Sequence, residues 1–232
     1  MSRRPILPPL YRGAALDAAG DAFLEAQARA RAGAGAGTLL WSARDDRFDC
    51  AVVLEPERPL AESLPVHYVA LLGFGDALGA LLPPAVDVTF DWPDRIAVNG
   101  GTVGGVRLAV PDAEAAATPD WMVVGAGAAL ADDPTDDEPG RNPGRTTLGT
   151  EGGAGIAPVD LVEAFARHFL VWLNRWQDDG FGPVRQAWLK RAAGSGGRVA
   201  GLDDSGGLLL IEDGGTRTLD LRRALQGATW LR

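Results

Sequence analysis

The stretch between residues 87 and 130 constrains the fold most, because it reads as short strands separated by tight turns. An Asn-Gly pair at positions 99–100 divides two of these strands. Such a pair favours a two-residue hairpin, since both central residues of that turn adopt positive φ angles. Strands joined by hairpins run antiparallel, so we predict an α+β fold with a mixed or antiparallel sheet packed against helices. The strands of this stretch are expected at residues 87–92, 95–100, 102–110 and 119–130.

Helix and strand patterns flank this stretch on both sides. From Pro158 to about Gln177, apolar residues recur at alternating steps of three and four, which places them on one face of a helix. Such a stripe is typical of a helix that packs on a core. Further helices are expected at residues 14–32, 65–81 and 183–194, and further strands at 38–42 and 48–54.

The last part of the sequence has a different pattern. After a Gly/Ser-rich linker at 194–197, residues 198–225 alternate short strands with turns at 204–206 and 213–215. A module of this size buries too little apolar surface to fold alone, so it must dock on a larger domain. We therefore expect two domains, residues 1–194 and a small β module at 195–232.

The net charge of −9 and the pI of about 4.7 argue against nucleic acid as a main partner, because an acidic surface repels a phosphate backbone. We expect no membrane partner, since no uninterrupted apolar run reaches the roughly 18 residues that span a bilayer. Prolines at positions 5, 8 and 9 interrupt the apolar N-terminal stretch, which argues against a signal peptide. The expected location is cytoplasmic.

Few residues are available for metal or thiol chemistry. Cys50 is the single cysteine, which excludes an internal disulfide and the usual cysteine-rich zinc sites. Its apolar strand indicates a buried thiol and not a nucleophile. His67 is expected on the surface or with its hydrogen bonds satisfied, and His168 lies too far along the chain to suggest a shared metal site. The acidic, Gly- and Pro-rich residues 131–157 indicate a mobile surface loop.

Five motifs follow one another in an order that resembles the biotin/lipoate protein ligase family, and most closely its biotin protein ligase branch. They are FDWPD (90–94), VNGGTVGGVRL (98–108), VVGAGAAL (123–130), FGPVRQAWLKRA (181–192) and GLDDSGGLLLIEDGG (201–215). The resemblance implies the fold of the class II synthetase/biotin–lipoate ligase catalytic domain, followed by an SH3-like β module. It begins at about residue 15 and does not include the N-terminal helix-turn-helix of the members that act as repressors.

The resemblance also implies a two-step reaction. ATP and biotin or lipoate form an acyl-adenylate, and the acyl group then moves to a lysine of a carrier domain. Such chemistry needs cationic or donor groups on the α-phosphate and a narrow apolar slot for the acid. The candidate ligand-binding residues at the matching positions are Trp92, Pro93, Asp94, Arg95, Thr102, Gly104, Gly105, Gly125, Gly127, Arg44 and Arg47.

The departures from the family pattern fall on the adenylation chemistry. Thr102 stands at the position of the family's essential lysine, and Lys190 is the only lysine in the chain. Residues 41–50 are too few for the family's glycine- and arginine-rich loop, and they keep only Arg44 and Arg47. Losing one such electrostatic donor typically lowers the rate about 100- to 1000-fold. We therefore assign no catalytic residue from the sequence.

Three hypotheses follow. The first is a family member that has lost adenylation and binds a small carboxylic acid or a carrier protein. The second is an active ligase or acyltransferase in which Arg44, Arg47, Arg95 and Arg107 converge on one cleft; an arginine close to Thr102 would favour it. The third is a non-catalytic structural or interaction protein. A homodimer is left open for all three.

Two groups of candidates also have simpler interpretations. The glycines at 104–105 and 125–127 could serve only to let the strands pack closely. Asp91, Asp94 and Arg95 could form ion pairs on the surface, which is the more usual role of such residues.

Overall fold

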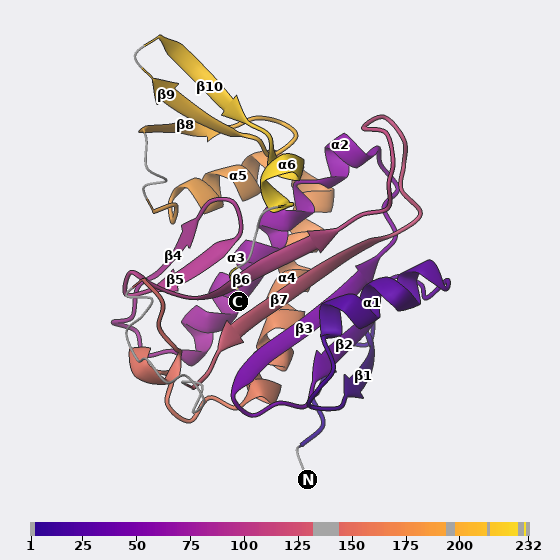
Figure 1. The fold of residues 1–232 in the computed structure, drawn as a ribbon, viewed down its shortest axis with the longest axis vertical. Helices are drawn as coiled ribbons and strands as arrows, with labels where there is room; N and C mark the ends of the chain where they lie inside the picture. The colour runs from indigo at the N-terminus through magenta and orange to yellow at the C-terminus, as the bar shows by residue number, and fades with distance from the viewer. Residues whose placement is uncertain (1–2, 132–143, 194–197, 213, 227–229, 231–232) are drawn as a thin grey trace.

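The computed structural model describes residues 3–131, 144–193, 198–212, 214–226 and 230. Its largest element is a seven-stranded sheet in the order β1-β2-β3-β7-β6-β5-β4 (Figure 1). Every neighbouring pair in this sheet is antiparallel except β1 and β2, which run parallel. The predicted α+β class is therefore confirmed. The strands are β1 (Arg12–Leu16), β2 (Thr38–Ser42), β3 (Arg47–Leu54), β4 (Val88–Asp91), β5 (Arg95–Val98), β6 (Gly101–Ala109) and β7 (Met122–Ala129).

Two long helices, α3 (Val66–Leu81) and α4 (Pro158–Asp179), pack against each other behind the sheet in the view of Figure 1. The ring of Phe48 from β3 lies 5.1 Å from that of Phe74 and 6.1 Å from that of Phe165, measured between centroids. Gly73 allows the helices to approach, because a Cβ there would lie 2.7 Å from the Cα of Phe169. The apolar stripe that follows Pro158 is thus part of the core, as the sequence predicts.

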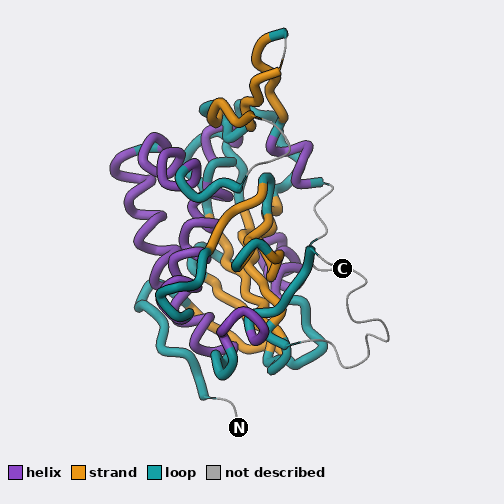
Figure 2. Tube along the Cα trace, turned by 90° about the vertical axis from the view of Figure 1, so that its left-hand side faces the viewer, coloured by secondary structure: helices purple, strands orange, loops and turns teal. Residues whose placement is uncertain are grey.

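The opposite face of the sheet is covered by α1 (Ala22–Arg31), which packs mainly on β2, β3 and β7. We call this side of the sheet the α1 face. The ring of Phe23 lies directly over Gly125, beside Val53 and Val123. Figure 2 shows the sheet nearly edge-on, with helices on both sides of it. The part of the α1 face formed by β6 and the adjoining end of β7 carries the candidate site.

The apolar segment Leu60–Leu81 consists of α2 (Leu60–Ser63) and α3. With a mean hydropathy of 1.4 it is long and apolar enough to cross a membrane, by length and composition only. A search for uninterrupted apolar runs overlooks such a segment. In the fold 78% of its most apolar window is buried inside the protein, so these residues build the core that α3 shares with α4.

The N-terminal helix predicted at residues 14–32 is wrong in its first third. Residues Arg12–Leu16 form β1 instead, and α1 begins at Ala22. Asp21 fixes that start, because its side chain accepts hydrogen bonds from the backbone N–H groups of Phe23 and Leu24. β1 exists because β2 offers it an edge, a condition that local helix propensity does not contain.

The other predicted elements are confirmed to within a few residues. Asn99 and Gly100 have φ angles of 49° and 87°, as the hairpin between β5 and β6 requires. Helix α5 (Phe181–Leu189) begins and ends earlier than the predicted 183–194. Gly180, at a φ of 75°, separates it from α4.

A second, three-stranded antiparallel sheet follows α5 and extends past one end of the main sheet (Figures 1 and 2). Its strands are β8 (Arg198–Leu202), β9 (Leu208–Glu212) and β10 (Gly215–Leu219), and a short helix, α6 (Leu221–Leu225), comes after them. The strands agree with the prediction, whereas α6 was not expected. The Tyr68 hydroxyl of α3 donates to the carbonyl of Gly206 at 2.5 Å, which ties this sheet to the core. The predicted linker at 194–197 lies outside the described residues.

The predicted surface loop at 131–157 lies in part outside the described residues, at 132–143. The remainder contains a short turn, η1 (Gly149–Gly153), and is not all on the surface. Thr147 and Leu148 are buried, and the backbone of Leu148 donates to Ala129 at the end of β7. The surface prediction is therefore wrong for these residues, because one apolar side chain anchors the returning segment beneath the sheet.

Candidate functional site

Two glycines lie side by side on the α1 face. Gly105 of β6 pairs with Gly127 of β7, and the indole of Trp230 lies over both. A Cβ on Gly105 would stand 2.9 Å from the indole nitrogen, and a Cβ on Gly127 would stand 2.9 Å from Cη2 of the same ring. Trp230 is only 5% exposed. We call Gly105 and Gly127 the glycine floor, because the absence of side chains there creates the space that the ring fills.

The two other candidate glycines have a different role. A Cβ on Gly104 would lie 2.7 Å from the Cα of Ala128, and one on Gly125 would lie 2.6 Å from the ring of Phe23. Their space is taken by backbone and by α1. The close-packing interpretation thus describes Gly104 and Gly125, and in part Gly105, whose Cβ would also meet the backbone oxygen of Asp94; the two glycines of the floor differ from the others in that a displaceable side chain, Trp230, lies over them.

Thr102, at the family lysine position, is bound along its backbone by the segment that returns after residue 143. Its N–H donates to the carbonyl of Gly144 at 2.8 Å, and its carbonyl accepts from the N–H of Thr146 at 3.0 Å. This pairing places Arg145 opposite Thr102. The Arg145 guanidinium donates to the backbone carbonyl of Trp230 at 2.5 Å. A cation therefore reaches the candidate site from a segment that no sequence motif connects with it.

Arg107 of β6 points along the same face toward α1. Its guanidinium donates to Asp21 at 3.1 Å and to Asp49 at 3.4 Å, and it stacks over the ring of Phe23 at 4.4 Å from the centroid. Burial raises the pKa of Asp49. Burial has the same effect on Asp21, but the hydrogen bonds from Arg107 and from backbone N–H groups outweigh it and lower the pKa of Asp21. The positive charge of Arg107 is thus compensated by two carboxyl groups.

The remaining candidate arginines occupy separate places. Arg44 donates to the carboxylate of Asp46, two residues further along the chain, at 2.8 Å. Arg47 begins β3 opposite Ala129, and Arg95 is exposed at the start of β5. The convergence of these side chains on one cleft stays a prediction.

Asp94 lies beside Gly105 and is 2% exposed, so the surface ion pair suggested for it is wrong. Its backbone carbonyl accepts from the N–H of Val106 at 2.9 Å, and a Cβ on Gly105 would clash with that oxygen. Its Oδ2 has no hydrogen-bond partner among the described residues. Burial raises the pKa of Asp94 to about 6, against the opposing charge of Arg95.

His67 on α3 is buried as well, so of the two alternatives expected for it the surface position is wrong, and its hydrogen bonds are satisfied only in part. Its Nε2 lies 2.9 Å from the carbonyl of Pro93, while its Nδ1 lacks a partner within the described ranges. Burial lowers the pKa of His67 to about 4, so the ring is neutral at pH 7 and donates through Nε2. Cys50 is also buried, and burial raises its pKa, in agreement with an unreactive thiol.

Trp92 faces the second sheet and not the glycine floor. Its indole N–H donates to the Tyr68 hydroxyl at 2.9 Å, and that hydroxyl donates onward to Gly206. Together with Pro93, whose carbonyl faces His67, it fixes the β4–β5 turn against α3. These two candidates therefore position Asp94 indirectly.

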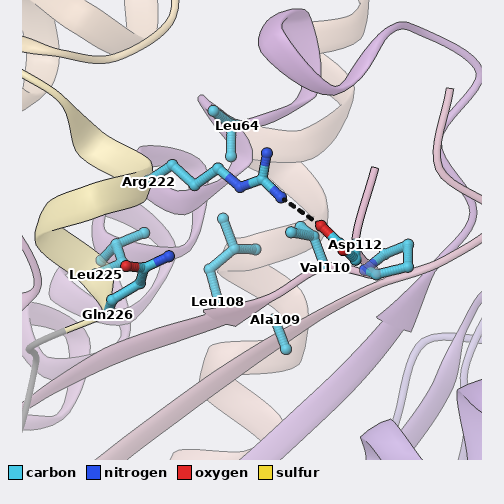
Figure 3. Close-up of a pocket in the computed structure, with 9 residues that line it drawn as sticks. Leu64, Leu108, Ala109, Val110, Asp112, Arg222, Leu225 and Gln226 are labelled. Carbon is cyan, nitrogen blue, oxygen red and sulfur yellow. Dashed lines mark ion pairs between the residues drawn. The ribbon is translucent and has the colours of Figure 1, made fainter. Parts of the chain in front are cut away.

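A separate pocket of about 320 Å³ lies where the end of β6 meets α6 (Figure 3). Leu64, Leu108 and Leu225 supply apolar walls, and Arg222 points toward Asp112 at 3.8 Å. Arg222 also donates to the carbonyl of Ala113 at 3.0 Å. These contacts fasten α6 to the main domain. Arg222 is the cation among the residues that line the pocket, and it is paired with Asp112. We therefore assign this pocket no ligand.

The comparison with known proteins agrees with this geometry. Residues 7–190 match the model of the Biotin/lipoate A/B protein ligase family. A biotin–acetyl-CoA-carboxylase ligase of Paracoccus denitrificans is 31% identical over 196 residues, which cover 77% of this chain and 80% of that protein.

Solved structures extend the likeness to nearly the full chain. A biotin protein ligase-like protein of unknown function from a Silicibacter species is 33% identical, with a TM-score of 0.86 over 95% of this chain and 98% of the other. The biotin protein ligase of Aquifex aeolicus, at 16% identity, shares the fold with a TM-score of 0.73 over 90% of this chain and 96% of its own. The family match and the identity to the Paracoccus enzyme lead to one conclusion: this chain belongs to the biotin/lipoate A/B protein ligase family.

Proposed function

We propose that this chain binds a small ring-bearing carboxylic acid of the biotin or lipoate type on the glycine floor and does not activate it with ATP. The observation that carries the proposal is the charge around the floor. Thr102 replaces the family lysine, and Arg107 is compensated by Asp21 and Asp49. An ATP triphosphate brings several negative charges, and adenylation needs uncompensated cations at the α-phosphate.

The acid itself makes smaller demands. A neutral ring needs an apolar, flat surface, which the glycine floor supplies. A carboxylate needs one hydrogen-bond donor, which Arg145 supplies; its guanidinium now donates to the carbonyl of Trp230 at 2.5 Å. The A. aeolicus ligase has been solved with biotin and ATP bound. We infer that this chain keeps the first of these two binding capacities.

A second candidate is an active biotin ligase, and Arg145 favours it. Pairing of Thr102 with Gly144 and Thr146 sets Arg145 opposite Thr102, the residue that the resemblance aligns with the family lysine. The curated relative in Paracoccus denitrificans is named as a ligase. In this candidate the cation has moved to another segment and still serves the adenylate.

Two measurements separate the candidates. Calorimetric titration with biotin and with lipoate tests binding of the acid, and exchange of labelled pyrophosphate into ATP in the presence of each acid tests adenylation. Binding without exchange supports the proposal. Exchange that disappears in Arg145→Met supports the active ligase. If neither acid binds and no exchange occurs, both are rejected and a carrier protein becomes the partner to test.

Several expectations keep the status of predictions. They are the division into domains at 1–194 and 195–232, the SH3-like character of the second sheet, the cytoplasmic location, a carrier domain as partner and a homodimer. Limited proteolysis and light scattering test the domain division and the assembly state.

A further inference from the structure

We infer that Trp230 is a resident occupant of the ligand site, so that a ligand must displace the protein's own side chain to reach the glycine floor. The inference rests on the proposed function for the identity of the ligand. It rests on this chain's own contacts for the identity of the occupant.

The first argument is steric. The indole fills the space that Gly105 and Gly127 leave open, at distances where even one added methyl group on either glycine would collide with it. A ring bound flat on the same two residues would overlap the indole. The ligand and Trp230 therefore exclude each other.

The second argument is polar. The backbone carbonyl of Trp230 accepts from Arg145, the one guanidinium that the returning segment places opposite Thr102. A flat ring on glycines and an oxygen on a cation are the two interactions that a ring-bearing carboxylate would make. Trp230 thus satisfies both halves of the site with one residue.

The third argument concerns reversibility. The indole nitrogen of Trp230 is buried and has no acceptor among the residues described. Asp94, whose backbone carbonyl lies beside Gly105, also has a buried carboxylate oxygen without a partner among the described residues. A buried donor without an acceptor weakens the contact that holds Trp230 in place, because the indole N–H pairs with water once the ring leaves the site.

Tethering explains why an imperfect occupant still fills the site. Trp230 follows α6, which is fastened by Arg222 to Asp112 and Ala113 near the end of β6. Because Trp230 belongs to the same chain as the site, its side chain competes at an effective concentration on the order of millimolar. A free ligand competes with it, and its apparent affinity falls by the fraction of molecules in which the site is open.

The experiment compares the intact chain with Trp230→Ala. Biotin and, separately, lipoate are titrated by calorimetry into both proteins. We expect binding to Trp230→Ala at least about tenfold tighter than to the unchanged protein, which corresponds to an occupancy of roughly 90% by the indole. Trp41→Ala is the matched control, because Trp41 is a half-buried tryptophan of β2 that packs on Gly13 away from the floor. Its affinity should equal that of the unchanged protein.

Equal affinities of the unchanged protein and Trp230→Ala would overturn the inference and leave the proposed function standing. If neither protein binds either acid, the proposed function fails, and exchange of the Trp230 indole hydrogen decides the inference. That signal is identified in an NMR spectrum by its absence from Trp230→Ala. Slow exchange in the absence of any ligand supports the resident indole, and exchange at the rate of a free indole overturns it.

Discussion

The pairing of Arg107 with Asp21 and Asp49 makes a quantitative prediction. Replacing Arg107 by Met keeps much of its length and apolar contact with Phe23 but removes the charge. Asp49, whose side chain is 10% exposed, then becomes a buried carboxylate without its cation. Breaking a buried pair in this way typically costs about 3–5 kcal/mol.

The expected cost here is lower, for two reasons. Asp21 is 38% exposed and keeps its backbone hydrogen bonds, so its share of the ion pair counts for little. Asp49 also keeps the hydrogen bond that it accepts from Ala22 at 2.8 Å, and it can take up a proton. We expect Arg107→Met to lower the free energy of unfolding by about 2–3 kcal/mol at pH 7.

The sign of the pH dependence follows from the pKa of Asp49, which burial already raises. Loss of Arg107 raises that pKa further, and a raised carboxyl pKa removes stability as the pH increases through it. The deficit of Arg107→Met should therefore shrink when urea unfolding is measured at pH 5 in place of pH 7. The double variant Arg107→Met with Asp49→Asn should recover most of the loss, because no buried charge remains.

Arg217→Met is the control for this series. Arg217 forms an exposed pair with Glu212, 62% and 52% exposed, so its removal should change stability by less than about 0.5 kcal/mol. A loss below about 0.5 kcal/mol in Arg107→Met itself would refute the reasoning. Arg107 would then be a cation available to a ligand, and the argument against ATP would lose its main support.

Three other perturbations test further parts of the structure. Tyr68→Phe removes the hydroxyl that lies between Trp92 and Gly206, so the indole N–H and the carbonyl lose their partner. We expect the free energy of unfolding in urea to fall by about 2–4 kcal/mol. An unchanged midpoint would show that the second sheet does not depend on this contact. Burial raises the pKa of Asp94 to about 6, so the unchanged protein should lose stability as this carboxyl ionises. Between pH 4 and pH 7 its free energy of unfolding should fall by up to about 3 kcal/mol more than that of Asp94→Asn. Parallel pH profiles of the two proteins would contradict the buried carboxyl. Gly125→Ala should lower the free energy of unfolding by about 1–3 kcal/mol, because its Cβ would lie 2.6 Å from the ring of Phe23. Gly79→Ala in α3, where a Cβ would have nothing within 4 Å, should raise it by up to about 1 kcal/mol. Equal effects of the two variants in thermal unfolding would show that α1 moves aside without cost.

The elements that could be read from the sequence are those with a local cause. Asn99-Gly100 specifies its hairpin through backbone preferences of two residues. The apolar stripe after Pro158 specifies a helix face, and Gly180 ends that helix. The order of the family motifs extended this reading to the whole fold, including the glycines of β6 and β7, because each motif is continuous in sequence.

The errors share a different origin. β1 forms because β2 is available beside it, and Thr147 and Leu148 are buried because the end of β7 receives them. Asp94 looked like a surface residue, yet it is buried, and the N–H of Val106 in β6 donates to its carbonyl. In each case the deciding contact joins segments that are distant along the chain.

The sequence alone determined the fold class, the hairpin and the core helices, because backbone preference and periodicity are local properties of the chain; that Thr102 stands in place of the family lysine stays a prediction from the motif order. Only the tertiary structure decided which glycines remain open and what charge surrounds them. Phe23 closes Gly125, Asp21 and Asp49 neutralise Arg107, and Trp230 reaches the glycine floor beside Arg145. A binding site forms where side chains from segments distant in sequence come into contact, and the spacing of residues along the chain does not show which of them meet.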